Sequence, residues 1–216
     1  MVEKFHDELK KLKKEVADMG NLAKDMLSDA VEALKERDRE LASGVIEKKK
    51  KIAEMDEKIE HTALALIALY QPMAKDMRTI ACVLKMITYL TRVGRYGKDI
   101  ARVAIELAEQ PHIAKLVEIP HMADMVCDMI EDALKAFENE DVSLIEDFEE
   151  RDSEIDALRY AIFRECITYM MEDAKNITRC MHYAMVARYL ERCADHACKM
   201  AEKINYMVTG ERKEIR

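Results

Sequence analysis

The sequence contains no tryptophan, only five glycines and only three prolines among its 216 residues. An all-β fold needs many turns between short strands, so this shortage of turn-forming residues argues against one. The sequence is instead rich in Met, Ala, Leu, Glu and Lys, which are common in helices. Because half of the residues are hydrophobic, a packed core is possible and wholesale disorder is excluded. The composition therefore predicts an all-α protein.

A C-x-x-C pair, a signal peptide and a long apolar run are also missing. The six cysteines fall in helix-like sequence, which is typical of buried thiols in a reducing compartment. Residues 1–14 are charged throughout, unlike a secretory signal. The longest uncharged apolar run, residues 63–70, is too short to span a bilayer. We therefore expect a cytosolic protein without a transmembrane segment.

Positive charge is scarce, with 35 Lys+Arg against 43 Asp+Glu and a formal net charge of -8. A general nucleic-acid binder needs a basic surface, so we expect no nucleic-acid partner. The acidity lies in one half: residues 1–112 have a net charge of +1 and residues 113–216 a net charge of -9. Because no Ser-His-Asp set, P-loop or dinucleotide fingerprint is present, the sequence predicts no enzyme activity.

The prolines and turn-like clusters divide the chain into six expected helices, at about 5–37, 38–70, 74–109, 119–138, 141–171 and 174–209. The halves repeat each other: at an offset of 103, Asp25, Asp29 and Asp38 match Asp128, Asp132 and Asp141. Chance matching of amphipathic helices explains shared apolar residues, but it does not readily explain the shared aspartates. Long helices with short connections pack as antiparallel neighbours. We predict two tandem antiparallel three-helix bundles, at 1–112 and 113–216.

In the second half, two expected helices each carry an acidic pair at i,i+4 spacing. Asp152 falls in register with the apolar seam of 148–166, and Asp156 follows on the same face. Glu191 and Asp195 lie on the shoulder of the last helix's seam. Like charges at this spacing repel, and near an interior the cost grows unless a cation or proton compensates. Four convergent carboxylates would suit a hard divalent cation or a cluster of cations.

The alternative is a solvated acidic ridge without metal. Its partners would be four nearby arginines: Arg151, Arg159, Arg188 and Arg192. Spacing alone favours this ridge, since acidic i,i+4 pairs are common on helices, whereas Asp152 in an apolar seam favours a metal. His196 follows Asp195 at about 100° around the helix, so we expect it at the rim of the site.

Together, the duplication and the acidic pairs resemble the PhoU family of phosphate-uptake regulators. The pattern stands here as Asp152-x-x-x-Asp156 and Glu191-Arg192-x-x-Asp195. Further similarity lies in three short segments: Gln71-Pro72-x-Ala74-x-Asp76-x-Arg78, Val45-Ile46-Glu47 and residues 168–173. The resemblance covers nearly the whole chain, and the order of its motifs makes it specific.

The resemblance implies a cytosolic all-α negative regulator of high-affinity phosphate uptake, which is not an enzyme. Its expected partners are the ATPase subunit of a Pst-type ABC transporter and, in addition, a sensor histidine kinase. It further implies a homodimer, with iron, zinc or manganese bound as single ions or a cluster. In this sequence, the residues that match the family's metal ligands are Asp152, Asp156, Glu191 and Asp195.

The first copy departs from this pattern. Its residues at the four ligand positions are Lys49, Ala53, Thr91 and Arg95. We therefore expect metal on the second repeat only. Lys49 and Arg95 would occupy the equivalent space as fixed charges or meet nearby acids, unless that site has simply drifted onto the surface.

Two other classes stay open as alternatives. A ferritin-type di-metal protein needs Glu-x-x-His motifs on facing helices. The only matches are Glu3-x-x-His6, at the terminus, and Glu109-x-x-His112, which spans Pro111, so this class is poorly supported. The other alternative is a helical adaptor that binds no metal.

Overall fold

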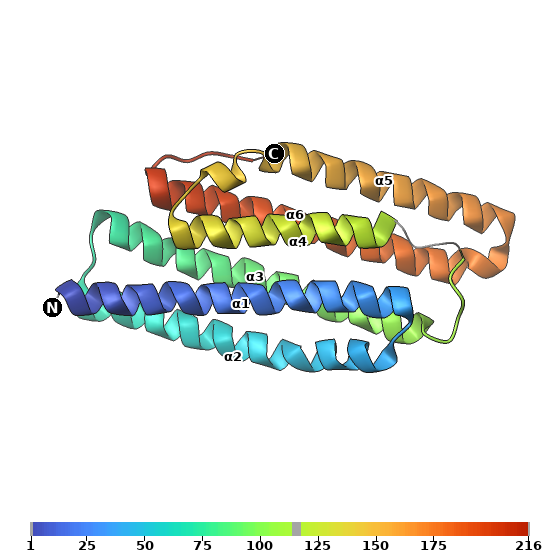
Figure 1. The fold of residues 1–216 in the computed structure, drawn as a ribbon, viewed down its shortest axis with the longest axis horizontal. Helices are drawn as coiled ribbons and strands as arrows, with labels where there is room; N and C mark the ends of the chain where they lie inside the picture. Colours follow the sequence, from blue (N-terminus) through green and yellow to red (C-terminus); the bar gives the residue numbers. More distant parts are fainter. Residues whose placement is uncertain (1, 114–117, 216) are drawn as a thin grey trace.

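The computed structural model describes residues 2–113 and 118–215, which form six α-helices and two 3-10 turns (Figure 1). The helices are α1 (Val2–Glu36), α2 (Arg39–Tyr70), α3 (Ala74–Leu107), α4 (Glu118–Asn139), α5 (Phe148–Glu172) and α6 (Ile177–Thr209). The predicted all-α fold of two three-helix repeats is confirmed, with α1–α3 as the first repeat and α4–α6 as the second. No helix in the described ranges is long and apolar enough to cross a membrane.

Proline and glycine delimit the helices as the sequence predicts. α2 ends where Gln71 adopts a positive φ of 49°, directly before Pro72. α6 ends at Gly210, whose φ of 80° closes the helix in the left-handed conformation that glycine tolerates best. Pro120 lies in the first turn of α4, where the backbone N–H that proline lacks has no helical partner in any case.

α5 begins later than the predicted residue 141. Asp141 accepts a hydrogen bond from the Ser143 N–H at 2.9 Å, and the chain makes a 3-10 turn before α5 starts at Phe148. In the first repeat, Asp38 instead caps α2 directly. α6 likewise begins at Ile177, after a second 3-10 turn. The two copies therefore share the position of the aspartate but not the start of the following helix.

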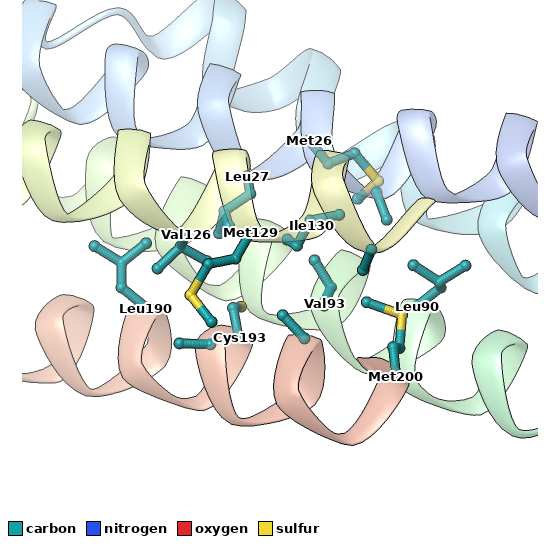
Figure 2. Close-up of a cluster of buried hydrophobic side chains, with 14 of the residues drawn as sticks. Met26, Leu27, Leu90, Val93, Val126, Met129, Ile130, Leu190, Cys193 and Met200 are labelled. Atoms are coloured by element: carbon teal, nitrogen blue, oxygen red, sulfur yellow. The ribbon is translucent and has the colours of Figure 1, made fainter. Parts of the chain in front are cut away.

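The core is continuous through both repeats. α1, α3, α4 and α6 pack against one another in the centre, while α2 packs on α1 and α3, and α5 packs on α4 and α6. Figure 2 shows Met26, Leu90, Val126 and Leu190, one from each central helix, in the same buried cluster. All six cysteines are free, and five of them are buried. The repeats therefore share one hydrophobic core; the boundary at 112/113 remains a prediction and falls in the α3–α4 connection.

Aromatic contacts between α3 and α6 show that the repeats are related by approximate two-fold symmetry. The rings of Tyr89 and His196 stack with centroids 5.7 Å apart, and those of Tyr96 and Tyr189 with centroids 5.5 Å apart. At an offset of 100, these two contacts are each other's counterpart. α1 also approaches α3 closely at Gly97, because a Cβ there would lie 3.0 Å from the Met26 backbone.

Candidate metal site on the second repeat

The four predicted ligands lie where α5 packs against α6. Asp152 and Asp156 are on α5, and Glu191 and Asp195 are on α6. The pKa of Asp152 is raised to about 6, first by burial and then by the negative charges of Asp195, Asp156 and Glu191. The four carboxylates are therefore close enough to repel one another, and a cation or a proton between them would relieve that repulsion.

Arginines compensate the acids on α6. Arg188 forms an ion pair with Glu191, and Arg192 contacts Asp195 at 2.7 Å. Arg159 reaches across from α5, with its Nε 3.8 Å from Glu191. Burial raises the pKa of Glu191, and the three guanidinium groups oppose that rise. Three of the four arginines that were expected to pair with the acids of a metal-free ridge therefore do so: Arg159, Arg188 and Arg192.

Arg151, the fourth arginine, lies elsewhere. Its guanidinium contacts Asp132 on α4 at 2.8 Å and lies over the Phe148 ring. It therefore ties α5 to α4 and leaves Asp152 and Asp156 without an arginine in the ion pairs of the described residues.

Asp152 does have a thiol neighbour that the sequence analysis missed. The Cys198 thiol lies beside Asp152 and lowers the pKa of that carboxyl, while burial and then the charge of Asp152 raise the pKa of the thiol. The spacing of Glu191, Asp195 and Cys198 is i, i+4, i+7, which places the three on one face of α6. That spacing was the available signal for including Cys198.

The donor set fits a hard cation, since Asp152, Asp156, Glu191 and Asp195 offer carboxylate oxygens only. Within residues 2–113 and 118–215, however, no group of three or more His, Cys, Asp or Glu side chains is already arranged as a metal site. Arg188 and Arg192 keep 39% and 43% of their side chains exposed, so they can turn into solvent if a cation takes their place. These four residues would hold the metal, and that assignment stays a prediction.

His196 faces away from the acidic pairs. Its ring stacks on Tyr89 and Tyr96 of α3. Burial, followed by the positive charge of Arg92, lowers the pKa of His196 to about 4, so the imidazole is neutral at pH 7. It belongs to the packing between the repeats.

The equivalent positions of the first repeat make a different contact. The Thr91 hydroxyl donates a hydrogen bond to Asp56 at 2.9 Å, which links α3 to α2. At an offset of 103, Asp56 matches Arg159, so this bond stands where Arg159 meets Glu191 in the second repeat. Arg95 lies 3.8 Å from Asp99 on its own helix, in agreement with the expectation that it meets a nearby acid.

The two Glu-x-x-His motifs do not line the core. Glu109 is exposed and pairs with Arg39 at 3.1 Å. His112 hydrogen-bonds to the Tyr183 hydroxyl and the Lys35 carbonyl, both at 2.9 Å. Glu3 and His6 are exposed near the start of α1. None of these side chains faces a partner motif on a neighbouring helix, as a ferritin-type centre requires.

The fold defines the class as a duplicated six-helix protein, in which two three-helix repeats share a core and differ in their acidic faces. The PhoU domain model matches residues 16–104 and again 119–204. The chain therefore belongs to the PhoU family, as the resemblance in the sequence predicted.

Individual relatives cover almost all of the chain. It is 38% identical over 207 residues to the phosphate-specific transport system accessory protein PhoU homolog of Rhizobium meliloti, covering 95% of this chain and 87% of that one. The corresponding protein of Aquifex aeolicus is 38% identical over 208 residues, covering 96% and 94% of the two chains. The crystal structure of PhoU from Pseudomonas aeruginosa superposes with a TM-score of 0.91 at 34% identity, covering 96% of this chain and all (100%) of that chain.

Proposed function

We propose that this protein is a cytoplasmic negative regulator of high-affinity phosphate uptake that is not an enzyme. It docks on the ATPase subunit of a Pst-type phosphate ABC transporter when phosphate is plentiful, and a sensor histidine kinase is a second partner. It acts as a homodimer and carries iron, zinc or manganese on the second repeat.

The observation that carries this proposal is the extent of the family match. Both repeats match the PhoU domain. Relatives whose similarity covers 95% or more of this chain are named accessory proteins of a phosphate-specific transport system. We infer that an accessory protein built of packed helices acts by docking on its partner through an exposed surface.

The second repeat offers such a surface at the tip of the α5–α6 hairpin, here called the hairpin face. Its large apolar side chains are all exposed: Tyr160, Phe163, Ile167 and Met171 on α5, with Ile177, Met181 and Met185 on α6. The spacings of three and four residues place each set on one side of its helix. Exposed apolar patches of this kind mark protein interaction sites.

The start of α1 explains why this tip is open. At an offset of 103, residues 2–10 of α1 correspond to residues 105–113, which lie at the end of α3 and in the connection after it and not in α4. In the first repeat, this extension at the start of α1 buries Phe5 and Leu9 in the core. Figure 1 shows the α5–α6 hairpin projecting beyond the start of α4. The second repeat thus lacks this cover, and its hairpin tip exposes seven large apolar side chains against four at the α2–α3 tip: Leu64, Leu69, Met73 and Met77.

The proposed metal lies on the same hairpin. Held between the acidic pairs of α5 and α6, it would supply positive charge that fixes one helix against the other. Arg188 and Arg192 provide part of that compensation without metal. Metal loading would therefore stiffen the hairpin whose tip makes the docking contact.

The test combines cell physiology with partner capture. In cells lacking the protein, phosphate uptake should stay high when phosphate is plentiful, and the wild-type chain should restore repression. Ile167→Asp should prevent both repression and capture of the ATPase subunit. The matched control is Leu64→Asp, since Leu64 is the counterpart of Ile167 and is also exposed.

Two results would overturn the proposal. One is normal repression of uptake in cells lacking the protein. The other is equal loss of capture with Ile167→Asp and Leu64→Asp, which would remove the hairpin face as the docking surface. Native mass spectrometry of the captured complex measures the dimer and the bound metal at the same time.

A metal-free adaptor is the second candidate function. It is favoured by one observation, the arginine contacts that already compensate Glu191 and Asp195. Partner capture that is unchanged after chelation, from protein purified without metal, would support the adaptor over the metal-bound regulator.

A further inference from the structure

A groove of about 670 Å³ runs between α3, the end of α6 and residues 211–215, and we call it the tail groove. Ala81, Cys82 and Lys85 of α3 line one side, and α6 contributes Lys199, Glu202, Lys203 and Tyr206. Arg212, Lys213 and Glu214 complete it from the chain that follows α6. It thus joins the first repeat to the second, at the opposite end of α6 from the hairpin face.

The tail groove is basic in a protein that is acidic as a whole. Its lining contains five cationic side chains and two carboxylates, whereas the chain has a net charge of -8. Glu202 is already engaged, because it contacts Lys199 at 2.7 Å, Lys203 at 3.7 Å and the Ile215 N–H at 3.2 Å. Lys85 and Arg212 form no ion pair with any described residue. Positive charge in the groove is therefore in excess.

Contacts at both ends hold the tail over the groove. At its start, the Asn205 side-chain amide donates a hydrogen bond to the Glu211 carbonyl at 2.9 Å. At its end, Ile215 is 7% exposed, and its N–H is bound by Glu202. Arg212, between these anchors, lies with its guanidinium 5.7 Å from the centre of the Tyr206 ring. Cations held in place before binding lose less conformational entropy when a ligand arrives.

A second groove, beside the start of α1, provides a comparison. It is lined by five lysines, but also by four acids: Asp7, Asp76, Glu138 and Glu140. Glu140 bridges two of the lysines, at 3.1 Å from Lys13 and 2.5 Å from Lys75. The charges of this groove nearly cancel, with five lysines against four acids, whereas the tail groove has five cations against two acids.

We propose that the tail groove binds a free, phosphorylated small molecule that carries several negative charges. Ammonium and guanidinium groups are the usual donors to phosphate oxygens, and arginine adds a two-pronged contact. A volume of about 670 Å³ is in the range of small-molecule sites, so a ligand larger than orthophosphate fills it better. Tyr206 and Ala81 offer apolar surface beside the charges. The proposal goes beyond the docking function and does not depend on which partner docks.

Isothermal titration calorimetry of the full chain tests the site, in buffer with a chelator so that no metal links a phosphate to the acidic pairs. The probes are orthophosphate, pyrophosphate and ATP, with anionic phosphatidylglycerol vesicles as the alternative source of phosphate groups. Pyrophosphate and ATP should bind more tightly than orthophosphate and more weakly as salt rises. The vesicles should not bind.

The double variant Lys85→Ala/Arg212→Ala should weaken binding by about tenfold or more, because each lost cation removes a charge-assisted hydrogen bond. Lys51→Ala/Arg164→Ala is the matched control: it removes one Lys and one Arg, both exposed, that lie outside the groove, and it should bind as wild type does. All four side chains are exposed, so circular dichroism should show both variants folded. Lys85→Gln alone should weaken binding by several fold and gives an independent check.

Three outcomes would overturn the proposal. They are no binding of any free probe, equal weakening in the two double variants, and binding to the vesicles alone. None of them bears on partner capture by the hairpin face, so this proposal and the docking function can fail separately.

Discussion

The packing faces of the two repeats differ in charge at five equivalent positions, with opposite charges at three of them and a neutral residue in the first repeat at two. On the second repeat these residues are Asp152, Asp156, Arg159, Glu191 and Asp195, and on the first they are Lys49, Ala53, Asp56, Thr91 and Arg95. Even the cross-helix contact is inverted, since Arg159 meets Glu191 where Asp56 accepts a hydrogen bond from Thr91. The duplicated backbone thus fixes the positions of these side chains, and the residue types give the two faces different charge.

Other features are the same in both copies. Lys48 contacts Asp29 at 2.7 Å, and Arg151 contacts Asp132 at 2.8 Å, which is the same bond at an offset of 103. The turn between the first two helices of each repeat also recurs, with Arg37 at φ 58° and Glu140 at φ 56°. The copies therefore agree in the contacts that shape the bundle and differ in the face that would bind metal.

The largest expected effect concerns the start of the second helix of each repeat. Phe148 and its counterpart Val45 are both fully buried. Phe148→Ala should lower the free energy of unfolding by about 3–5 kcal/mol, because a large cavity forms, and Val45→Ala by about 2 kcal/mol. Urea denaturation measures both. Equal losses would show that the extra volume of Phe148 adds nothing to the second repeat.

A smaller effect is expected at the close approach of α1 to α3. Gly97, which matches Ala197, has no room for a Cβ beside the Met26 backbone, so Gly97→Ala should destabilise the protein by about 1–2 kcal/mol. Gly44 is the control, since a Cβ there meets nothing within 4 Å. Gly44→Ala should stabilise by up to about 1 kcal/mol through helix propensity. Shifts of the denaturation midpoint in the same direction for both variants would contradict this account.

The pH dependence of stability tests the repulsion among the acids. The pKa of Asp152 is raised to about 6 in the folded protein, so between about pH 4 and pH 6 the native state holds a proton that the unfolded state has lost. Asp152 should therefore contribute a loss of stability as pH rises through this window, of about 1 kcal/mol after allowance for solvent screening. His196, whose pKa is lowered to about 4, contributes in the opposite direction, because the unfolded state binds the proton that the buried imidazole lacks. Thermal unfolding of metal-free protein at several pH values should therefore show stability rising more steeply with pH in Asp152→Asn than in the wild type. Equal slopes in the two proteins would assign the titration to another group.

The smallest effect concerns the shared ion pair. Arg151 keeps 21% of its side chain exposed, whereas Lys48 keeps 38%. Double-mutant cycles with alanine should give a coupling of about 1 kcal/mol for Arg151 with Asp132 and about 0.5 kcal/mol for Lys48 with Asp29. A stronger coupling in the first repeat would reverse the expected order.

The sequence predicted the number and order of the helices because hydrophobic periodicity, proline and glycine act locally. It also showed the duplication, since shared aspartates survive at a fixed offset. It misplaced the start of α5, because the Asp141 side chain can cap either a helix or a 3-10 turn and the choice depends on tertiary packing.

The candidate site was only partly predictable for the same reason. Spacing places Asp152 and Asp156 on one face of α5, but which arginine turns toward which carboxylate depends on the neighbouring helix. Arg151 pairs with α4, while Arg159 reaches α6. The open hairpin tip was also missed, because it results from the extension at the start of α1, which packs only on the first repeat, and not from the residues of the tip.

Metal quantification of the purified full chain tests the central claim, that the two repeats diverged into one metal-binding and one metal-free copy. Plasma mass spectrometry should find metal in the wild type and in Lys49→Ala, and none in Asp152→Ala. Two equivalent sites per chain, or metal that survives Asp152→Ala, would contradict the account.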